Sequence, residues 1–555
     1  MRSYQIFWVI LAVALFLRVW TLGTPFTSDE NPWPYAAADH SNAGFNFVID
    51  RGFDTFVWTS PPLAPLAYRF FTWFIGVNEI TMRLLPMIIG LINIWLTYLL
   101  ARKLFDPKSA VFAAGLMAVS FWHILASFLI EHDSSILTLF WLLFFHSWLL
   151  FETTRKTKWL FGCGIVLGLA SLTKLTGGLM LIALAVYLVW KHGSLKEPVI
   201  ACAKILGIGL AVFAVFPILS LLLYPAYIKE TFIHAGVLTF IPSLFSPIRI
   251  IIYLLLWATP LLTGLALLSL FEPDKRARLL WCWAGAVILF YTLTKYFGAI
   301  DRYMAVMIPA LCILGGRELA KRLEFRDLKK VILIALPFLA LFILLNFIPS
   351  SWIEHNTATY IGKALTFDWA FIFQFWGSGG PAFMASFIPL GAGILLCLLS
   401  LALFIYAIHS EKEKAIQRSF VLFVAVALAF NLFIVQAFVT KEPYPDVGSA
   451  TKGIIAEMKI LPEPFYANDM NLAWYIDRKA DFYVIGDVYT DEQKEVDQLN
   501  AIIKRRGGTL IITDYPKYLK TDPIWQLAGE CRLQKTFGSK EIILGYIFAC
   551  QPRII

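Results

Sequence analysis

The stretch RLLPMIIGLINIWLTYLLARKLF, residues 83–105, is a long apolar run that carries two adjacent basic residues, Arg102 and Lys103, near its end. A helix needs about 20 apolar residues to cross a bilayer, and this run is long enough to do so. Basic residues gather in the loops on the cytoplasmic side of membrane proteins, so the run also indicates which of its ends faces inward. It therefore predicts a transmembrane helix whose C-terminal end lies in the cytoplasm.

The composition extends this prediction to the whole chain. Of 555 residues, 59% are hydrophobic and only 15% are charged, which is more apolar surface than one soluble core can bury. The formal net charge is +9 at pH 7, but most basic residues fall in short clusters between apolar runs. That distribution orients helices in a bilayer. It argues for membrane lipids, and against nucleic acid, as partners.

Similar apolar runs recur along the chain and predict thirteen transmembrane helices. They lie at about 5–22, 82–101, 109–127, 134–151, 159–173, 177–190, 201–223, 248–270, 279–294, 303–320, 331–348, 386–408 and 419–438. The first run is predicted to be a retained helix rather than a cleaved signal peptide, because Arg18 interrupts its far end and no small-residue cleavage site follows. Arg18 itself is predicted to extend to the membrane interface, as basic residues at helix ends do by default.

Loop charge predicts the orientation of these helices. Alternate loops are basic, for example ETTRKTK (152–158) and RELAKRLEFRDLKK (317–330), and are assigned to the cytoplasm. The other loops, including the large loop 23–81, then face outward, and an odd number of helices places the C-terminus outside as well. We predict a multi-pass protein of the plasma (inner) membrane, with an α-helical transmembrane domain over residues 1–439 and an extracytoplasmic C-terminus.

The sequence becomes mixed and polar after this domain, and residues 440–555 are predicted to form a small extracytoplasmic α/β domain. It contains a helix-like stretch and two short β-rich runs, at about 491–506, 482–485 and 509–513. Cys531 and Cys550 are the two of the seven cysteines that lie in polar sequence. Outside the cytoplasm they could form a disulfide, although spacing alone does not establish the geometry.

The outer loop 349–383 is rich in aromatic residues and contains apolar stretches too short to span a bilayer. One interpretation is that these stretches are interfacial helices that shape an entrance for a lipid chain. The other is that their aromatic side chains only anchor the loop at the level of the lipid headgroups.

Ionisable residues gather at the predicted outward ends of the helices. They are Arg18, Asp29, Glu30, His40, Asp50, Asp54, Arg83, Glu131, His132, Asp133, Lys174, Lys295, Asp301 and Arg302. Charged groups near the membrane boundary are costly unless they are paired, solvated or used. Cations can hold phosphate oxygens and stabilise a leaving phosphate, while a carboxylate can take a proton from an attacking hydroxyl. The mixture suits a substrate with an anionic head on a lipid tail and a neutral group to be activated.

The sequence predicts no structural metal site. No regular Cys/His spacing and no nucleotide-phosphate cradle are evident in the outward loops. His132 has no partner at metal-ligand spacing, so we expect it to make a polar contact instead. The sequence implies no certain cofactor and leaves open whether a divalent metal takes part.

Six motifs in order carry a resemblance to a known family. They are the Asp29-Glu30 pair, SPPLAPL (60–66), RLLPMIIGLINIWLTYLLARKLF (83–105), EHDSSILTLFWLL (131–143), LGLASLTKLTGGLMLI (167–182) and DRYMAVMIPAL (301–311). With its thirteen-helix layout, the chain resembles the GT-C superfamily of polyprenyl-phosphate-sugar glycosyltransferases, and within it the protein O-mannosyltransferases and the aminoarabinose transferases that modify lipid A. The resemblance covers residues 1 to about 320 and implies a membrane GT-C fold.

The resemblance also implies roles for the matched residues. The catalytic positions of the family are occupied by Asp29, Glu30 and Asp133. The first of these is the loop aspartate that acts as base or orients the acceptor. The basic and hydroxyl positions that we assign to the donor phosphate are occupied by Arg83, Lys174, Arg302 and Tyr303. The family inverts the anomeric centre in one displacement, which needs a base and a stabilised phosphate leaving group but no covalent enzyme intermediate.

We therefore predict an inverting glycosyltransferase that moves a sugar from a polyprenyl-phosphate donor to an acceptor hydroxyl or phosphate on the outer face of the membrane. The segments NPWP (31–34), Thr59-Ser60 and FLIEH (128–132) depart from the family pattern. These departures leave open whether the acceptor is a lipid, a glycan or a protein. The alternatives are a glycolipid transporter (flippase) and a noncatalytic binder of lipid-linked sugar. Transporters often show internal repeats, and none is evident here, which favours catalysis.

Overall fold

The computed structural model describes the chain in twelve ranges: 3–27, 30, 32–38, 61–192, 196–223, 245–271, 274–293, 301–376, 380–476, 482–484, 492–518 and 522–552. Several predicted residues lie outside these described residues. They are Asp29, His40, Asp50, Asp54, Thr59, Ser60 and Lys295.

Within the described ranges, eight helical segments are long and apolar enough to cross a membrane, or up to nine if the pair Pro247–Trp257 and Thr259–Leu268, bent by 106°, is one span. The eight are α4 (Glu79–Leu104), α7 (Ser135–Thr154), Leu175–His192, Lys196–Ile218, Asp301–Arg322, α18 (Asp327–Asn346), α20 (Phe387–His409) and α21 (Glu413–Thr440). Four shorter apolar helices are α1 (Ser3–Phe16), α5 (Pro107–Val119), α8 (Thr157–Thr173) and α15 (Ala277–Leu293). The predicted multi-pass helical membrane fold is confirmed, and the count of thirteen spans stays a prediction.

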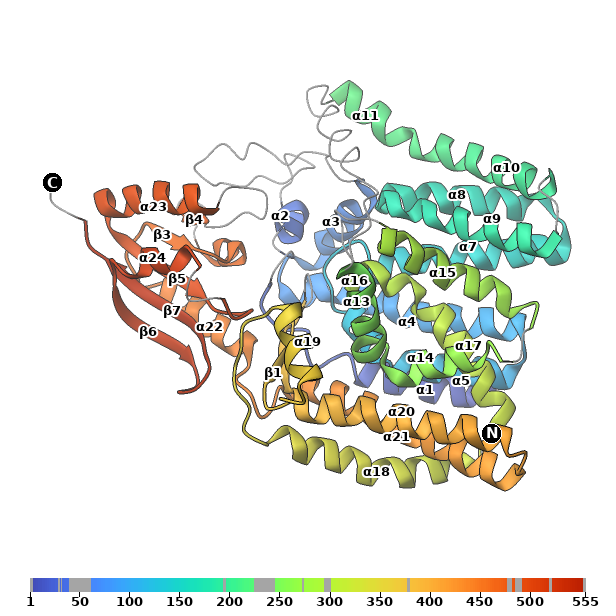
Figure 1. Ribbon diagram of the computed structural model, residues 1–555. Helices are drawn as coiled ribbons and strands as arrows, with labels where there is room; N and C mark the ends of the chain where they lie inside the picture. The colour runs from blue at the N-terminus through green and yellow to red at the C-terminus, as the bar shows by residue number, and fades with distance from the viewer. Residues whose placement is uncertain are drawn as a thin grey trace.

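The remaining helical elements subdivide or connect these segments. They are α2 (Pro32–Ala38), α3 (Leu63–Ile75), α6 (Phe121–Ala126), η2 (Leu175–Gly178), α9 (Leu179–His192), α10 (Lys196–Phe213), α11 (Val215–Leu223), α13 (Phe245–Ile252), η4 (Tyr253–Trp257), α14 (Thr259–Leu268), α16 (Asp301–Met304), η5 (Ala305–Met307) and α17 (Ile308–Arg322). In Figure 1 the long helices run side by side, and the short elements α2, α3, α13 and α16 lie toward the end that faces the C-terminal sheet.

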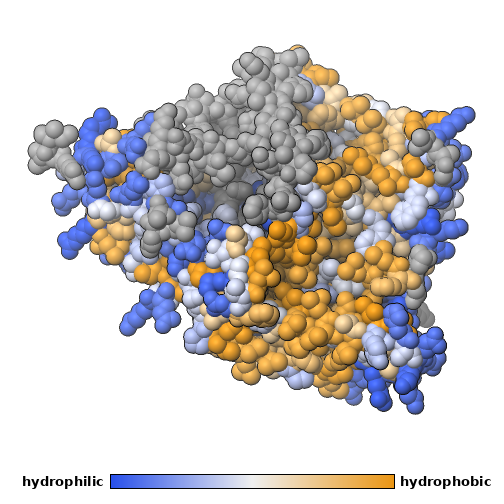
Figure 2. Space-filling view, in the orientation of Figure 1, coloured by the Kyte–Doolittle hydropathy of each residue, from blue (hydrophilic) through white to orange (hydrophobic). Residues whose placement is uncertain are grey.

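The surface of the helices is largely apolar, as expected for helices that contact lipid. Figure 2 shows hydrophobic side chains over the helices, with hydrophilic ones at the far helix ends and over the sheet. Large apolar side chains such as Trp8, Leu344 and Tyr406 are 62%, 69% and 74% exposed. So much exposed apolar surface is typical of an interaction with lipid rather than with water.

The stretch 83–105 forms most of α4, and the residues at the two ends of this helix explain where it begins and ends. At the N-terminus the Asn78 side chain accepts a hydrogen bond from the Thr81 backbone N–H at 3.0 Å, while the Thr81 hydroxyl accepts one from the Asn78 N–H at 2.9 Å. This reciprocal capping box satisfies two backbone donors that have no partner inside the helix. Arg102 and Lys103 occupy the last turn, where cations interact favourably with the helix dipole.

Helix α17 is the central helix of the bundle, and it fixes the elements at its N-terminal end. The most apolar window of Asp301–Arg322 is 94% buried. Its Gly316 permits this, because a Cβ there would lie 2.5 Å from the backbone nitrogen of Ala113 on α5. Small residues let membrane helices approach closely. The short helix α16, which precedes α17, is therefore held in a defined place.

The outer segment 349–386 is partly buried in the protein. It contains one helix, α19 (Thr357–Leu365), and an antiparallel hairpin of β1 (Ile372–Phe375) and β2 (Phe383–Ser386). The hairpin residues are all buried, and the rings of Phe375 and Phe383 stack with centroids 4.4 Å apart. The aromatic side chains of the hairpin therefore pack inside the protein, whereas Phe367 beside α19 is 80% exposed, so both interpretations of the segment stay predictions.

The C-terminal region holds a five-stranded sheet of order β4-β3-β5-β7-β6, in which β3 is parallel to β4 and β5 and the other pairs are antiparallel. Its strands are β3 (Phe465–Ala467), β4 (Phe482–Val484), β5 (Gly508–Thr513), β6 (Arg532–Gly538) and β7 (Ile543–Cys550), and its helical elements are α22 (Val447–Met458), η6 (Met470–Tyr475), α23 (Glu492–Arg506) and α24 (Ile524–Ala528). The predicted α/β character is confirmed. The division of the chain at residue 440 remains a prediction.

Helices cover both faces of this sheet. Leu510 and Ile512 of β5 share a core with residues of α23, whereas Ile511 between them shares a core with residues of α22. Successive side chains of a strand point to opposite faces, so α23 and α22 lie on opposite sides, as Figure 1 shows. The sheet region thus has apolar cores of its own.

The sheet region is also joined to the outer segment and to the first loop. Tyr515 donates its hydroxyl proton to the Phe383 carbonyl at 2.7 Å, and the Lys517 N–H donates to the Gln374 side chain at 2.8 Å. The Phe26 N–H donates to the Tyr475 hydroxyl of η6 at 2.9 Å. The C-terminal region therefore contacts the same end of the bundle as the loop that begins at residue 23.

Cys531 and Cys550 form a disulfide with a sequence separation of 19. The bond joins the residue before β6 to the last residue of β7. Replacing both cysteines, in C531S/C550S, is expected to lower the free energy of unfolding of the sheet region by about 3 kcal/mol, because the unfolded chain gains the entropy of an open loop. The loss of stability is measured by heating the protein and monitoring the unfolding of the sheet region by limited proteolysis. Cys202→Ser serves as a control. Equal stability of the double variant and the wild type would contradict the prediction.

Candidate functional site

Three segments bring predicted site residues together at one end of the bundle. Asp133 lies in the loop between α6 and α7, Lys174 lies between α8 and η2, and Arg302 lies on α16. The Lys174 ammonium lies 2.6 Å and 2.8 Å from the two carboxylate oxygens of Asp133, and the Arg302 Nε lies 3.9 Å from one of them. We name Asp133, His132, Lys174, Arg302 and Tyr303 the Asp133 cluster.

Tyr303 contributes the face of its ring to this cluster. The Lys174 nitrogen lies 3.5 Å from the ring centroid, and the Arg302 guanidinium carbon lies 5.2 Å from it. Tyr291 stacks on the same ring with centroids 5.7 Å apart. Cations are attracted to the negative face of an aromatic ring, so Tyr303 helps to hold both cations beside Asp133.

The electrostatics of the cluster keep Asp133 ionised. Burial alone would raise the pKa of Asp133, but Lys174, His132 and then Arg302 outweigh it and hold that pKa well below its usual range. The Asp133 side chain is 1% exposed, whereas those of Lys174 and Arg302 remain 15% and 12% exposed. A ligand would therefore reach the cations rather than the carboxylate.

Glu131 supports the cluster through backbone hydrogen bonds, a role that was not predicted from the sequence. Its carboxylate accepts hydrogen bonds from the backbone N–H groups of Asp133 and, at 2.6 Å, of Ser134. Burial, followed by the charge of Asp133, raises the pKa of Glu131 to about 8. Its own N–H donates to the Tyr68 hydroxyl at 3.1 Å. Glu131 thus shapes the turn that presents Asp133.

His132 makes the polar contact expected from the sequence. Its Nε2 lies 3.2 Å from an Asp133 oxygen, and its ring meets the Trp33 ring edge to face with centroids 5.3 Å apart. Its position directly before Asp133 in the EHD motif was the only signal in the sequence that it belongs to the site.

Glu30 and Arg83 do not join the cluster but pair with each other. Two guanidinium nitrogens of Arg83 lie 2.7 Å from the two Glu30 oxygens, and the side chains are 0% and 1% exposed. Arg83 also donates to the carbonyls of Thr24, Pro25 and Phe128. We correct the sequence-based assignments accordingly: with its donors already engaged, Arg83 is not placed to bind phosphate, and Glu30 is not placed to act on a substrate.

Arg18 is buried instead of extending to the membrane interface, which corrects a second expectation. Its guanidinium donates to the Ala118 carbonyl and to the Ser127 hydroxyl, both at 3.1 Å, and lies 2.8 Å from Nδ1 of His123. The break between α5 and α6 leaves carbonyl groups that need donors. Arg18 and Arg83 therefore hold the segment that leads into the Asp133 turn from two sides.

Asp29 lies outside the described residues, but its neighbours on both sides are held in place. The Thr27 hydroxyl donates to the Gly380 carbonyl at 2.7 Å, and the Thr27 N–H donates to Glu30 at 3.1 Å. Glu30 in turn accepts a hydrogen bond from the Ile130 N–H at 3.4 Å. The loop that carries Asp29 is therefore fastened to the segment that ends in the Asp133 turn.

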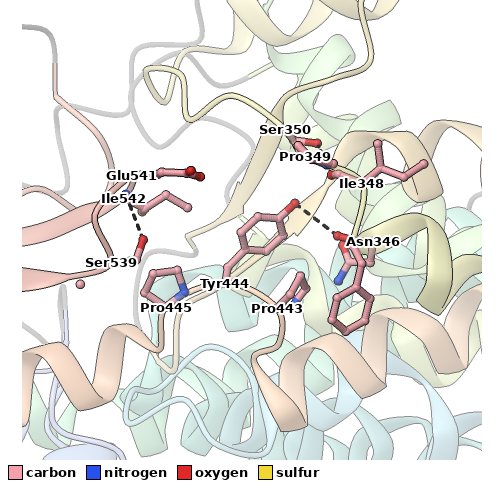
Figure 3. Close-up of a pocket in the computed structure, with 12 residues that line it drawn as sticks. Asn346, Ile348, Pro349, Ser350, Pro443, Tyr444, Pro445, Ser539, Glu541 and Ile542 are labelled. Atoms are coloured by element: carbon pink, nitrogen blue, oxygen red, sulfur yellow. Dashed lines mark hydrogen bonds between the residues drawn. The ribbon is translucent and has the colours of Figure 1, made fainter.

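Neither a metal site nor the cavity beside Tyr444 competes with this cluster within the described ranges. In the part of the chain that the structure describes, no group of three or more His, Cys, Asp or Glu side chains could hold a metal ion. A cavity of about 480 Å³ lies where the end of α18, the segment after α21 and the turn between β6 and β7 meet, and Figure 3 shows the residues that line it. Tyr444 crosses it and donates to the Asn346 carbonyl at 3.4 Å. Glu541 is the one charged residue among the described residues that line the cavity. The described lining therefore offers no cation to a phosphate.

Comparison with known proteins agrees with this architecture. Residues 59–221 match the family model of dolichyl-phosphate-mannose-protein mannosyltransferase. A search of curated protein sequences finds no match. Among solved structures, ArnT from Cupriavidus metallidurans is similar in the apo state, with a TM-score of 0.61 and 17% identity over 99% of both chains. The same protein bound to undecaprenyl phosphate gives a TM-score of 0.62 and 17% identity over 100% of both chains.

These similarities bear on different parts of the chain. The family match covers the segment with α4, α7 and α8, which positions Asp133 and Lys174. The structural similarity covers the whole chain, including the C-terminal sheet region, and at 17% identity it speaks for the fold. The chain therefore shares its fold with ArnT, and residues 59–221 resemble the dolichyl-phosphate-mannose-protein mannosyltransferases.

Proposed function

We propose that this protein transfers a sugar from a polyprenyl-phosphate-linked donor to an acceptor hydroxyl or phosphate on the outer face of the membrane. The observation that carries the proposal is the convergence of Lys174 and Arg302 on the ionised Asp133. The family match, and a fold shared with a protein that binds undecaprenyl phosphate, support it.

Lys174 and Arg302 are assigned to the phosphate of the donor. Both cations remain partly exposed, and both can donate charge-assisted hydrogen bonds to phosphate oxygens. Asp133 keeps them side by side before the donor arrives, because it offsets their mutual repulsion. Two cations and one carboxylate leave one net positive charge, which matches the single negative charge of a phosphodiester donor.

The transfer is a single displacement with inversion. The acceptor oxygen forms a bond to the anomeric carbon while the bond from that carbon to the phosphate oxygen breaks. The polyprenyl phosphate leaves with the electron pair and gains a negative charge, which Lys174 and Arg302 stabilise. We assign Asp29 to orient or deprotonate the acceptor, and no covalent intermediate with the enzyme is required.

Two observations support an outward location of the site. Loop charge assigns the opposite helix ends to the cytoplasm. The disulfide between Cys531 and Cys550 is typical of an oxidising compartment. The C-terminal region, which contacts the same end of the bundle as the first loop, is then extracytoplasmic in a plasma membrane protein.

A transfer assay tests this function. Purified full-length protein is incubated with labelled polyprenyl-phosphate sugars and extracted membrane acceptors, and the labelled product is quantified. We expect transfer by the wild type and about 10²–10⁴-fold less by Asp29→Asn, because general acid–base groups contribute that much. Asp368→Asn changes a carboxylate on the outer segment that is 53% exposed and should leave the rate unchanged.

The outcomes separate the three classes of function. A transporter would move the labelled lipid across a vesicle without making a covalent product, and a noncatalytic binder would retain the lipid without product. Either outcome with every donor tested contradicts the glycosyltransferase proposal. Equal rates for the wild type and Asp29→Asn contradict the role of Asp29 alone.

A further inference from the structure

His132 carries a buried ring nitrogen with no hydrogen-bond partner. Its Nε2 lies 3.2 Å from Asp133, while its Nδ1 is buried and unpaired. The side chain as a whole remains 20% exposed, so the ring lies at the edge of the Asp133 cluster. An unpaired buried polar atom costs free energy, and such atoms call for an explanation, of which a catalytic role is one.

Asp133 fixes which nitrogen of His132 carries the proton. Because Asp133 is ionised, its oxygen can only accept a hydrogen bond, so Nε2 donates. The neutral ring then has a free lone pair on Nδ1. A carboxylate that orients an imidazole in this way is the arrangement by which histidine becomes a general base.

The surroundings of His132 favour its neutral form before the reaction. Burial lowers its pKa, Asp133 opposes this, and Lys174 and Arg302 lower it further. Among the residues that the structure describes, the charged or titratable groups around the ring are Asp133 and Glu131 on its own loop, Lys174 at the end of α8 and Arg302 on α16. From α2 the indole of Trp33 packs against the ring. A neutral imidazole can accept a proton at pH 7.

We propose that Nδ1 of His132 accepts the proton of the acceptor hydroxyl during sugar transfer while Asp29 orients that hydroxyl, an inference that rests on the proposed function. The acceptor oxygen forms its bond to the anomeric carbon, and its proton passes to Nδ1. The bond between the anomeric carbon and the phosphate oxygen breaks, and polyprenyl phosphate leaves with the electron pair. Nothing is oxidised or reduced, and the imidazolium releases its proton to water after the products depart.

The charges of the cluster favour this location for the proton. The donor phosphodiester carries one negative charge, and the departing polyprenyl phosphate carries two near neutral pH. In the resting cluster, Lys174, Arg302 and Asp133 give one net positive charge, and protonated His132 adds a second. Positive charge then appears beside the phosphate at the moment when the phosphate gains negative charge. Electrostatic stabilisation of this kind acts on the transition state rather than on the bound substrate.

The pH dependence of transfer by the full-length protein tests this role. Protonated His132 cannot accept a proton, so kcat/KM of the wild type should fall as the pH falls through the pKa of His132, which lies below its ordinary value of about 6.5. In His132→Gln this acid limb should disappear and kcat should fall by about 10²–10⁴-fold. KM for the donor should change little, because Lys174 and Arg302 are retained. His409→Gln changes an exposed histidine elsewhere and should behave as the wild type does.

A second variant keeps the test independent of folding. His132→Ala, checked for folding by gel filtration and for binding of polyprenyl phosphate, should regain part of its kcat when imidazole is added. Wild-type kcat with an intact acid limb in His132→Gln, or no gain from imidazole in folded His132→Ala, overturns the role of His132. If the wild type itself transfers no sugar, the proposed function fails instead, so the two failures are distinguishable.

Discussion

Lys174→Ala is expected to lower kcat/KM for sugar transfer by about 10²–10³-fold, the loss seen when one preorganised donor to a developing oxyanion is removed. Lys174 lies 2.6 Å from Asp133 and 3.5 Å from the centroid of the Tyr303 ring. Both contacts hold its ammonium in place before the phosphate arrives, so little reorganisation is needed in the transition state. The alanine variant also removes the net positive charge of Lys174, Arg302 and Asp133, which weakens their attraction for the phosphate.

Lys191 offers a matched control for this experiment. It pairs with Glu152 at 2.5 Å and lies 5.8 Å from the centroid of the Tyr187 ring, so its surroundings resemble those of Lys174. It lies in the last turn of α9, at the helix end assigned to the cytoplasm. Lys191→Ala should keep kcat/KM close to that of the wild type. Equal activity of Lys174→Ala and Lys191→Ala in a steady-state transfer assay would contradict the phosphate role of Lys174.

Arg83→Met is expected to lower the free energy of unfolding by about 3–5 kcal/mol, because it leaves Glu30 as an unpaired charge in the interior. The Glu30 and Arg83 side chains are 1% and 0% exposed, so water cannot replace the lost partner. The loss should also loosen the loop that carries Asp29, since Arg83 donates both to Glu30 and to the Phe128 carbonyl and so joins that loop to the segment before Asp133. Chemical denaturation in mixed micelles, monitored by tryptophan fluorescence, measures the change in the free energy of unfolding.

Two further variants separate the unpaired charge from the loss of packing. The double variant E30L/R83M removes both charges and should recover most of the stability, as apolar replacements of buried ion pairs often do. Lys108→Met breaks an exposed pair with Glu324, whose side chain is 63% exposed, and should cost no more than about 1 kcal/mol. If Arg83→Met were no more destabilising than Lys108→Met, the stabilising role of the buried Glu30–Arg83 pair would be contradicted.

Much of the fold could be predicted because its signals are local. The apolar run that becomes α4 is long, and its basic end is part of the same segment. The hairpin of β1 and β2 could not be predicted in this way, since an apolar run of four residues has no periodicity that separates strand from helix. The burial of Arg18 depends on the Ala118 carbonyl, which lies 100 residues away in the chain. No local pattern records that contact.

The candidate site could likewise be predicted only in part from the sequence. The order of motifs along the chain was enough to place Asp133, Lys174 and Arg302 in one neighbourhood, and the structure brings them together. Residue type and position in the sequence could not distinguish Lys174 and Arg302 from Arg83. All three are basic residues at helix ends near the predicted outer face of the membrane. What distinguishes Arg83 is the set of carbonyls and the carboxylate that surround it, and that set exists only in the folded chain.

The central claim is that the Asp133 cluster binds the phosphate of a polyprenyl donor, and a binding measurement tests it without requiring turnover. Polyprenyl phosphate and unphosphorylated polyprenol are titrated into wild type, Lys174→Ala and Lys191→Ala. We predict that Lys174→Ala binds polyprenyl phosphate about 10–100-fold more weakly than the other two proteins, the worth of one charge-assisted hydrogen bond, and that all three bind polyprenol with the same low affinity. If Lys174→Ala bound polyprenyl phosphate as tightly as the wild type, the claim would be contradicted.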